Sequence, residues 1–299
     1  MSNTSLIIEE RSRDIGNFFV GRLLPFVEKR AVGPFVFIDH MGPSIIGENG
    51  KYIDVDQHPH IGLCTLTYLF EGEIEHRDST GAEMIIQPGS VNLMVAGRGV
   101  THTERTPQNL RNGKPHKMHG YQIWIALPKE FEEVEPSFHH IPKDELPSWN
   151  ENGIEFKLVT GEIKVNETTY KSPTPTFSKS FMIDVFSEKD NKLNLSGKLF
   201  GEIGIVVVKG AIIENKGLEN EHTIEQGQMM IAKMRDFCEL GIEAGTQLLI
   251  FGGEPLEKRY MYWNFVSSSM ERIEIAKKDW AENKFSKVPN DDTYIHLPN

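Results

Sequence analysis

Four side chains with metal-binding chemistry stand in two pairs along the chain. The first pair is His58 and His60, and the second is His102 and Glu104. Because successive side chains of a β-strand point to opposite faces, both members of a pair share a face if the pair lies on a strand. Two such strands lining one small barrel would bring three imidazoles and one carboxylate together. Nitrogen and oxygen donors without a thiolate suit Fe(II), Mn(II), Ni(II) or Zn(II).

The composition excludes several other classes of function. The chain has 299 residues, enough for two ordinary domains or one large one. No apolar run approaches the length of a membrane span. The formal net charge is −11, and no basic cluster interrupts it, which argues against binding to phosphate backbones. We therefore expect no membrane association and no direct nucleic-acid partner.

The ends of the chain and its cysteines indicate where the protein works. Residues 1–10 have no basic segment followed by an apolar core, so we do not expect a signal peptide. Cys64 and Cys238 lie far apart and form no disulfide framework, as in a reducing compartment. The chain also lacks a basic nuclear-localisation cluster, so the expected location is cytoplasmic.

Short apolar runs separated by turn residues fill both halves of the chain. They occupy residues 35–38, 65–70, 84–86, 91–95 and 121–127, and then 154–159, 181–185, 204–210, 229–232 and 247–253. Strands of this length without helical periodicity indicate a sandwich or barrel. An acidic, proline-bearing segment, residues 128–147, is expected to be an irregular crossing between the halves. The turns around Gly72 and Gly89 resemble those around Gly210 and Gly227, which predicts a duplicated barrel.

The last element is predicted to be a helix over residues 270–284. Ser268 and Glu271 have the spacing of a capping box, and Ile273, Ala276 and Trp280 fall on one face. The second series of strands does not repeat the ligand set, because it contains a single histidine, His222, in neither an H-x-H nor an H-x-E pattern. We therefore expect a metal in the first barrel only.

Several ordered blocks of the first half resemble the pirin family. They read GPFVFIDHMGP at residues 33–43, HPHIG at 58–62, YLFEGEIEHRDS at 68–79, AGRGVTHTE at 96–104 and HGYQIW at 119–124. In the second half the resemblance is looser. Residues 262–267, YWNFVS, depart from the Gly-Pro-Phe-Val-Met-Asn block associated with the family.

The resemblance implies an all-β fold of two tandem cupin (jelly-roll-like) β-barrels. We expect a metal-binding cupin domain at residues 1–135 and a cupin domain without a metal site at residues 136–299. The resemblance also implies a mononuclear Fe(II) held by His58, His60, His102 and Glu104, although zinc, nickel or manganese could occupy a purified sample.

Two functions are described for the family, and both stay open here. One is a quercetin 2,3-dioxygenase, which would use O₂ and a flavonol-like substrate. Four protein ligands leave two positions of an octahedral shell for these two reactants, and Glu104 is the candidate catalytic base. The other is a transcription coregulator that acts through a protein partner and senses the redox state of iron without catalysis. We favour the enzyme because no interaction motif stands out.

One position in the first half departs from the family pattern. Cys64 stands where the family usually has Glu, at the start of a strand that could face the metal. A thiol there would be either a redox-sensitive neighbour of the iron or a small buried hydrophobic residue, and we favour the second.

Overall fold

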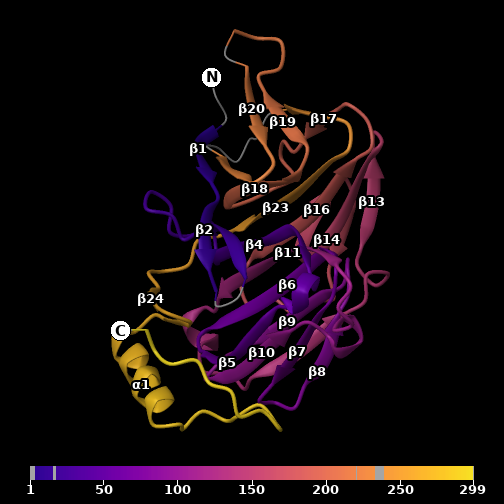
Figure 1. Cartoon of the computed structure of the whole chain (residues 1–299). Helices are drawn as coiled ribbons and strands as arrows, with labels where there is room; N and C mark the ends of the chain where they lie inside the picture. Colours follow the sequence, from indigo (N-terminus) through magenta and orange to yellow (C-terminus); the bar gives the residue numbers. More distant parts are fainter. Residues whose placement is uncertain (1–3, 16–17, 220, 233–238, 299) are drawn as a thin grey trace. The chain divides into compact units, whose positions relative to one another are not determined.

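The computed structural model describes residues 4–15, 18–219, 221–232 and 239–298, so Cys238 lies outside the described residues. Almost all of the regular structure is β-strand (Figure 1), which confirms the predicted all-β class. No helix among the described residues is long and apolar enough to cross a membrane. Three short 3₁₀ helices occupy Glu48–Gly50, Gln108–Leu110 and Lys129–Phe131.

The chain divides into two compact units built from non-contiguous segments. One unit, here called the N-terminal barrel, comprises Ser12–Arg22, Phe37–Lys143 and Leu256–Asn299. The other, the C-terminal barrel, comprises Met1–Arg11, Leu23–Val36 and Asp144–Pro255. The division into one cupin domain at residues 1–135 and another at residues 136–299 stays a prediction.

The N-terminal barrel is built from a large and a small antiparallel sheet. The large sheet has the order β12-β9-β6-β11-β4-β3-β2, and the small sheet has the order β5-β10-β7-β8. Their strands are β2 (Arg11–Asp14), β3 (Phe19–Leu24), β4 (Phe35–Ile46), β5 (Asp54–His60), β6 (Leu63–Glu71), β7 (Ile74–Asp78), β8 (Glu83–Ile86), β9 (Val91–Val95), β10 (Val100–Arg105), β11 (His116–Ala126) and β12 (Ser137–Ile141). A hairpin, β24 (Tyr260–Tyr262) and β25 (Phe265–Ser267), completes the strands of this unit.

The C-terminal barrel has the same construction. Its large sheet has the order β1-β21-β18-β23-β16-β14-β13, with β15 paired to β14, and its small sheet has the order β17-β22-β19-β20. Their strands are β1 (Thr4–Glu9), β13 (Ser148–Glu151), β14 (Ile154–Val165), β15 (Thr168–Lys171), β16 (Ser180–Ser187), β17 (Asn191–Asn194), β18 (Glu202–Lys209), β19 (Ala211–Glu214), β20 (His222–Glu225), β21 (Gln228–Ala232), β22 (Glu239–Ile242) and β23 (Thr246–Gly253). The indigo strand β1 of Figure 1 pairs with β21, which lies more than 200 residues later in the sequence.

The strand orders confirm the duplication that the paired turns predicted. Adding twelve to each strand number converts β5-β10-β7-β8 into β17-β22-β19-β20, and β9-β6-β11-β4 into β21-β18-β23-β16. The edge beside β9 is occupied by β12, and the equivalent edge beside β21 is occupied by β1.

The predicted helix is α1 (Met270–Ala281), which is shorter than expected at its C-terminal end. The predicted face is confirmed, because Ile273, Ala276 and Trp280 are buried. The predicted cap is wrong by one residue: Ser269 accepts a hydrogen bond from the Arg272 amide. Ser268 instead donates both its amide and its hydroxyl hydrogen to Glu132.

The segment between the two series of strands is more ordered than the sequence predicted. It contains β12, and Glu132 within its acidic run is 5% exposed rather than solvated. The Glu132 carboxylate accepts hydrogen bonds from Ser267 and Ser268 and pairs with Arg259 at 3.0 Å. These contacts fasten the residues before α1 to the N-terminal barrel, because a buried carboxylate is stable only when it is paired and hydrogen-bonded.

Candidate metal centre

The three predicted histidine ligands come from two neighbouring strands of the small sheet. In the antiparallel pair β5–β10, His58 lies directly opposite His102, and His60 lies opposite Val100. All three imidazoles are buried, with exposed fractions of 7% for His58, 1% for His60 and 0% for His102. The turn that precedes β10 needs glycine at position 97, where φ is +49° and a Cβ would meet the Val134 carbonyl at 2.0 Å.

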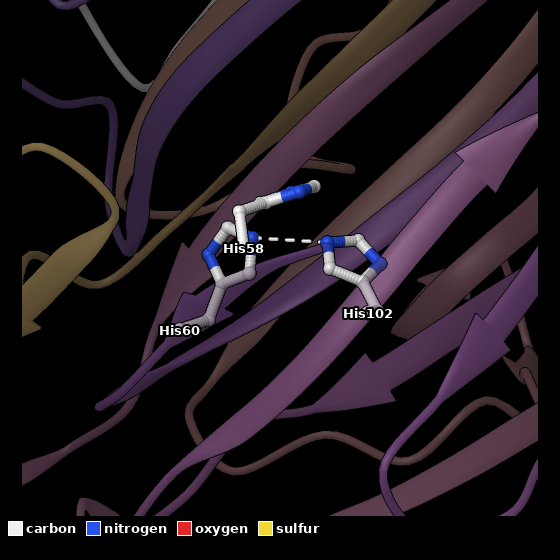
Figure 2. A group of neighbouring side chains, drawn as sticks. All are labelled: His58, His60 and His102. Atoms are coloured by element: carbon white, nitrogen blue, oxygen red, sulfur yellow. Dashed lines mark hydrogen bonds between the residues drawn. The ribbon is translucent and has the colours of Figure 1, made fainter. Parts of the chain in front are cut away.

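The three side chains point toward one another (Figure 2). One nitrogen of each ring lies within 4.8 Å of the other two. His60 Nε2 and His102 Nε2 are 3.0 Å apart, close enough for one of them to donate a hydrogen bond to the other. Among the described residues, this is the one group of three or more potential ligands that converges in this way.

Burial keeps these imidazoles in the form that binds metal ions. Desolvation lowers the pKa of His58 to about 4, and it lowers the pKa values of His60 and His102 well below the ordinary value. His58 Nδ1 lies 2.8 Å from the Asp56 carbonyl, to which it donates, so its Nε2 carries the lone pair. A neutral imidazole such as His58, with one nitrogen engaged and the other free to coordinate, fits a divalent metal.

Glu104 lines the same cavity as His58 and His60 but does not belong to the compact group of three histidines. Its orientation is set by the neighbouring strands: Thr67 donates to Gln122 Oε1 at 2.6 Å, and Gln122 Nε2 donates to Glu104 Oε1 at 2.8 Å. Burial raises the pKa of the Glu104 carboxyl despite this hydrogen bond. Its assignment as a fourth ligand stays a prediction.

The histidines face a cavity of about 580 Å³ within the N-terminal barrel. Phe37 and Trp124 stack with ring centroids 3.9 Å apart, and the edge of His60 meets Trp124 at 5.1 Å. The Arg22 guanidinium lies 4.4 Å over Phe37 and forms two 2.8 Å hydrogen bonds to Asp39. The cavity therefore offers a flat aromatic wall close to the imidazoles, with charged groups at fixed positions beside it.

Part of this cavity comes from the end of the chain, which sequence reasoning missed. Trp263, Asn264 and Ile295 line it. The first two belong to the block, residues 262–267, that departs from the family pattern. Trp263 has a φ of +53°, a left-handed conformation that is strained for a bulky residue and that often marks a functional site.

The C-terminal residues are tied to the ligand strand by Gln57, the neighbour of His58. The buried Gln57 amide donates to the carbonyls of Asp291 and Thr293 at 3.0 and 3.1 Å, and its Oε1 accepts from the Val288 amide at 2.7 Å. The Ile295 amide donates to the Gln57 carbonyl at 2.9 Å. The sequence shows only a glutamine beside His58, and its burial, which demands several hydrogen-bond partners, is visible only in the structure.

The position of Cys64 favours the structural interpretation over the redox one. In the β6–β11 pair, Thr65 lies opposite Trp124 and Thr67 lies opposite Gln122, and both opposite residues line the cavity. Because side chains alternate along a strand, Cys64 is on the other face of β6, away from the histidines. Burial also raises the pKa of its thiol, which disfavours the reactive thiolate.

Comparisons with known proteins agree with this arrangement. Two family models match: Pirin over residues 18–125, and the Pirin C-terminal cupin domain over residues 182–286. A pirin-like protein of Caulobacter vibrioides is 41% identical over 297 residues, which cover 98% of this chain and 99% of that protein.

Solved structures extend the comparison. The crystal structure of a quercetin 2,3-dioxygenase from Acinetobacter baumannii has a TM-score of 0.85 and 31% identity, and the match covers 98% of this chain and 95% of that chain. The Escherichia coli pirin YhhW, solved in complex with nickel(II), has the same fold, with a TM-score of 0.61 and 18% identity over 84% of this chain and 99% of that chain.

Proposed function

The chain belongs to the pirin family, and we propose that it is a metal-dependent dioxygenase that cleaves a flavonol such as quercetin with O₂. The observation that carries the proposal is the convergence of three buried, neutral imidazoles on an aromatic-walled cavity. The similarity of this chain to the Acinetobacter baumannii quercetin 2,3-dioxygenase supports the choice of substrate class. The cavity volume lies within the usual range for small-molecule sites.

Fe(II) is the proposed metal, and His58, His60 and His102 would hold it together with Glu104. The donor set fits because it contains nitrogen and oxygen but no sulfur, a set that also accepts the nickel seen in YhhW. When bound, such a metal supplies Lewis acidity toward a hydroxyl and an adjacent carbonyl and gives access to O₂.

The chain's own residues would orient the substrate and take its proton. The stacked pair Phe37–Trp124 and the half-buried Trp263 offer flat surfaces for a planar flavonol. Glu104 would accept the flavonol hydroxyl proton, because its raised pKa makes it a better base than an exposed carboxylate. Gln122 would keep the carboxylate pointed at the cavity throughout.

The direct test is O₂ uptake by Fe(II)-loaded protein given quercetin, beside a His58→Ala/His102→Ala double variant. We expect uptake and a ring-cleaved product from the wild type and neither from the double variant. If the wild type holds one iron per chain and still consumes no O₂, the dioxygenase proposal is wrong. Capture of a protein partner by one iron oxidation state would then become the next experiment.

The role of Glu104 has its own test. Glu104→Gln should keep the shape of the site but remove the base, so turnover should fall by roughly a hundredfold. Glu130→Gln, at an exposed position that does not line the cavity, is the matched control and should turn over normally. A Glu104→Gln protein that retains iron and full turnover would exclude the proton-transfer role.

A further inference from the structure

Two buried polar residues beside the histidines have no part in the proposed reaction. His76 and Asp78 lie on β7, with exposed fractions of 2% and 0%. Strand β7 pairs with β10 so that Asp78 lies directly opposite His102. Neither residue lines the cavity, so neither contacts a substrate there.

Hydrogen bonds connect these two residues to one of the ligands. Asp78 Oδ2 is 2.9 Å from His76 Nε2, and His76 Nδ1 is 3.4 Å from His102 Nδ1. The other carboxylate oxygen, Asp78 Oδ1, accepts from the Thr80 amide at 2.8 Å and the Thr80 hydroxyl at 2.6 Å. The carboxylate is thus fixed in place from the side opposite the imidazoles.

The positions of the protons follow from these contacts. A carboxylate only accepts, so the hydrogen between it and His76 belongs to Nε2 of His76. With its hydrogen on Nε2, His76 offers Nδ1 as the acceptor for a hydrogen on Nδ1 of His102. The remaining nitrogen, His102 Nε2, is left with the lone pair that faces His60 Nε2 and the metal position.

We propose that Asp78 and His76 are positioning residues that hold the His102 proton on Nδ1 and so keep the Nε2 lone pair directed at the metal. This inference rests on the proposed metal site. His58 is oriented by the Asp56 carbonyl, a backbone group. His102 is oriented by the side chain of His76, which in turn is held by the Asp78 carboxylate. The basicity of His102 as a ligand can therefore be changed by substituting either residue. Partners of this kind typically contribute ten- to hundredfold to metal affinity.

The test uses Co(II) as the bound metal and ¹H NMR as the readout. Imidazole N–H protons of a Co(II) ligand are shifted far from the protein envelope and disappear when they exchange with D₂O. In the Co(II)-loaded wild type, the His102 Nδ1–H should give a slowly exchanging signal, because it is buried and hydrogen-bonded.

Two substitutions of similar size separate positioning from packing. His76→Leu removes the acceptor, so the His102 signal should broaden or exchange rapidly, and Co(II) affinity should fall by roughly ten- to hundredfold. His76→Gln retains an acceptor oxygen and should recover most of the signal and the affinity. Phe138→Leu is the control, because Phe138 stacks on His76 at 4.4 Å without joining the hydrogen bonds.

Asp78→Asn tests the same series of hydrogen bonds at the end that is farther from the metal ligand. An amide that donates to His76 Nε2 would force the His76 proton onto Nδ1, where it would face the Nδ1–H of His102. This variant should therefore behave like His76→Leu, and it stands in for that variant if His76→Leu does not fold.

Unchanged Co(II) affinity and an unchanged signal in His76→Leu and Asp78→Asn would overturn the inference. Equal losses in His76→Leu and His76→Gln would overturn it too, because they would indicate a packing role. A wild type that binds no Co(II) would refute both the metal site and this inference. If the NMR results are as expected but no O₂ is consumed, the dioxygenase proposal alone fails.

Discussion

The small sheets of the two barrels share one strand order, but one carries a cluster of polar imidazoles and the other contributes to an apolar core. In the N-terminal barrel, His58 on β5 lies opposite His102 on β10. In the C-terminal barrel, the corresponding strands β17 and β22 place Leu193 opposite Leu240. Both leucines belong to one continuous apolar core that also takes side chains from the large sheet. The strand order therefore supplies a position, and the residue placed there decides whether it becomes a metal site or part of a core.

The difference also bears on stability. The C-terminal barrel fills its interior with aliphatic side chains, and each buried one contributes roughly 1.5 to 3 kcal/mol. The N-terminal barrel has imidazoles and a cavity in the equivalent space. It also has an apolar cluster in which Ile61 packs with Phe265 and the buried face of α1. The residues after position 255 thus supply apolar packing in addition to the cluster that Leu69, Ile74 and Met118 form within this barrel.

The largest expected effect is on metal affinity, when a histidine of the N-terminal barrel is replaced by leucine, the residue type paired between β17 and β22 in the C-terminal barrel. Loss of a residue that hydrogen-bonds to a metal ligand typically weakens metal binding ten- to hundredfold. His102→Leu removes a proposed ligand itself, so its effect should be larger. Metal affinity should therefore fall by more than about a hundredfold, while the fold should be retained because leucine suits a buried strand position. Isothermal titration with Co(II) measures the loss, and circular dichroism checks the fold. Wild-type affinity in His102→Leu would mean that the three-histidine cluster is not the site.

The reverse substitution should destabilise the C-terminal barrel. Leu240→His would place an imidazole without a designed partner in an apolar core, and we expect a loss of about 4 kcal/mol in the free energy of unfolding. Urea unfolding followed by the fluorescence of Trp149, the one tryptophan of this barrel, measures it. Leu240→Met is the control and should lose less than about 1.5 kcal/mol. Equal stability of both variants would show that this interior tolerates a polar ligand.

Without metal, the two barrels should also differ in how their stability depends on pH, and this difference should be the smallest of the three. Burial lowers the folded-state pKa of His58 to about 4, against an ordinary value of 6.5. Between these values the unfolded chain binds more protons than the folded one, so stability falls as pH decreases from 6.5 toward 4. For His58 the loss is roughly 3 kcal/mol, and His60 and His102 act in the same direction.

Urea midpoints measured in EDTA between pH 7 and pH 4.5 test this expectation. His58→Gln should reduce the pH dependence of the N-terminal barrel, because glutamine does not titrate, while His60 and His102 retain their share of it. The apolar interior of the C-terminal barrel should show no comparable slope. If wild type and His58→Gln lose stability in parallel, the buried histidine is not the cause.

The sequence predicts those parts of the site that depend on local periodicity. The alternation of side chains was enough to bring His58, His60 and His102 together, and apolar runs located strands such as β9 and β16. It could not predict contacts that depend on register or on the return of a distant segment. Asp78 meets His102 only because β7 and β10 pair in one register. Ile295 reaches the cavity through hydrogen bonds that leave no pattern in the sequence around it.

The contacts of Gln57 have a consequence for the order of events during synthesis. A ribosome makes the strand that carries His58 first, and it adds the residues that hold Gln57 only 231 to 234 positions later. At 5–20 residues per second, roughly 10 to 50 s separate the two. During that interval the nascent ligand strand lacks part of its support, and one wall of the cavity does not yet exist. Stable metal loading therefore has to wait until residues 288–295 have been made, and a product terminated before them would carry all three histidines without a finished site.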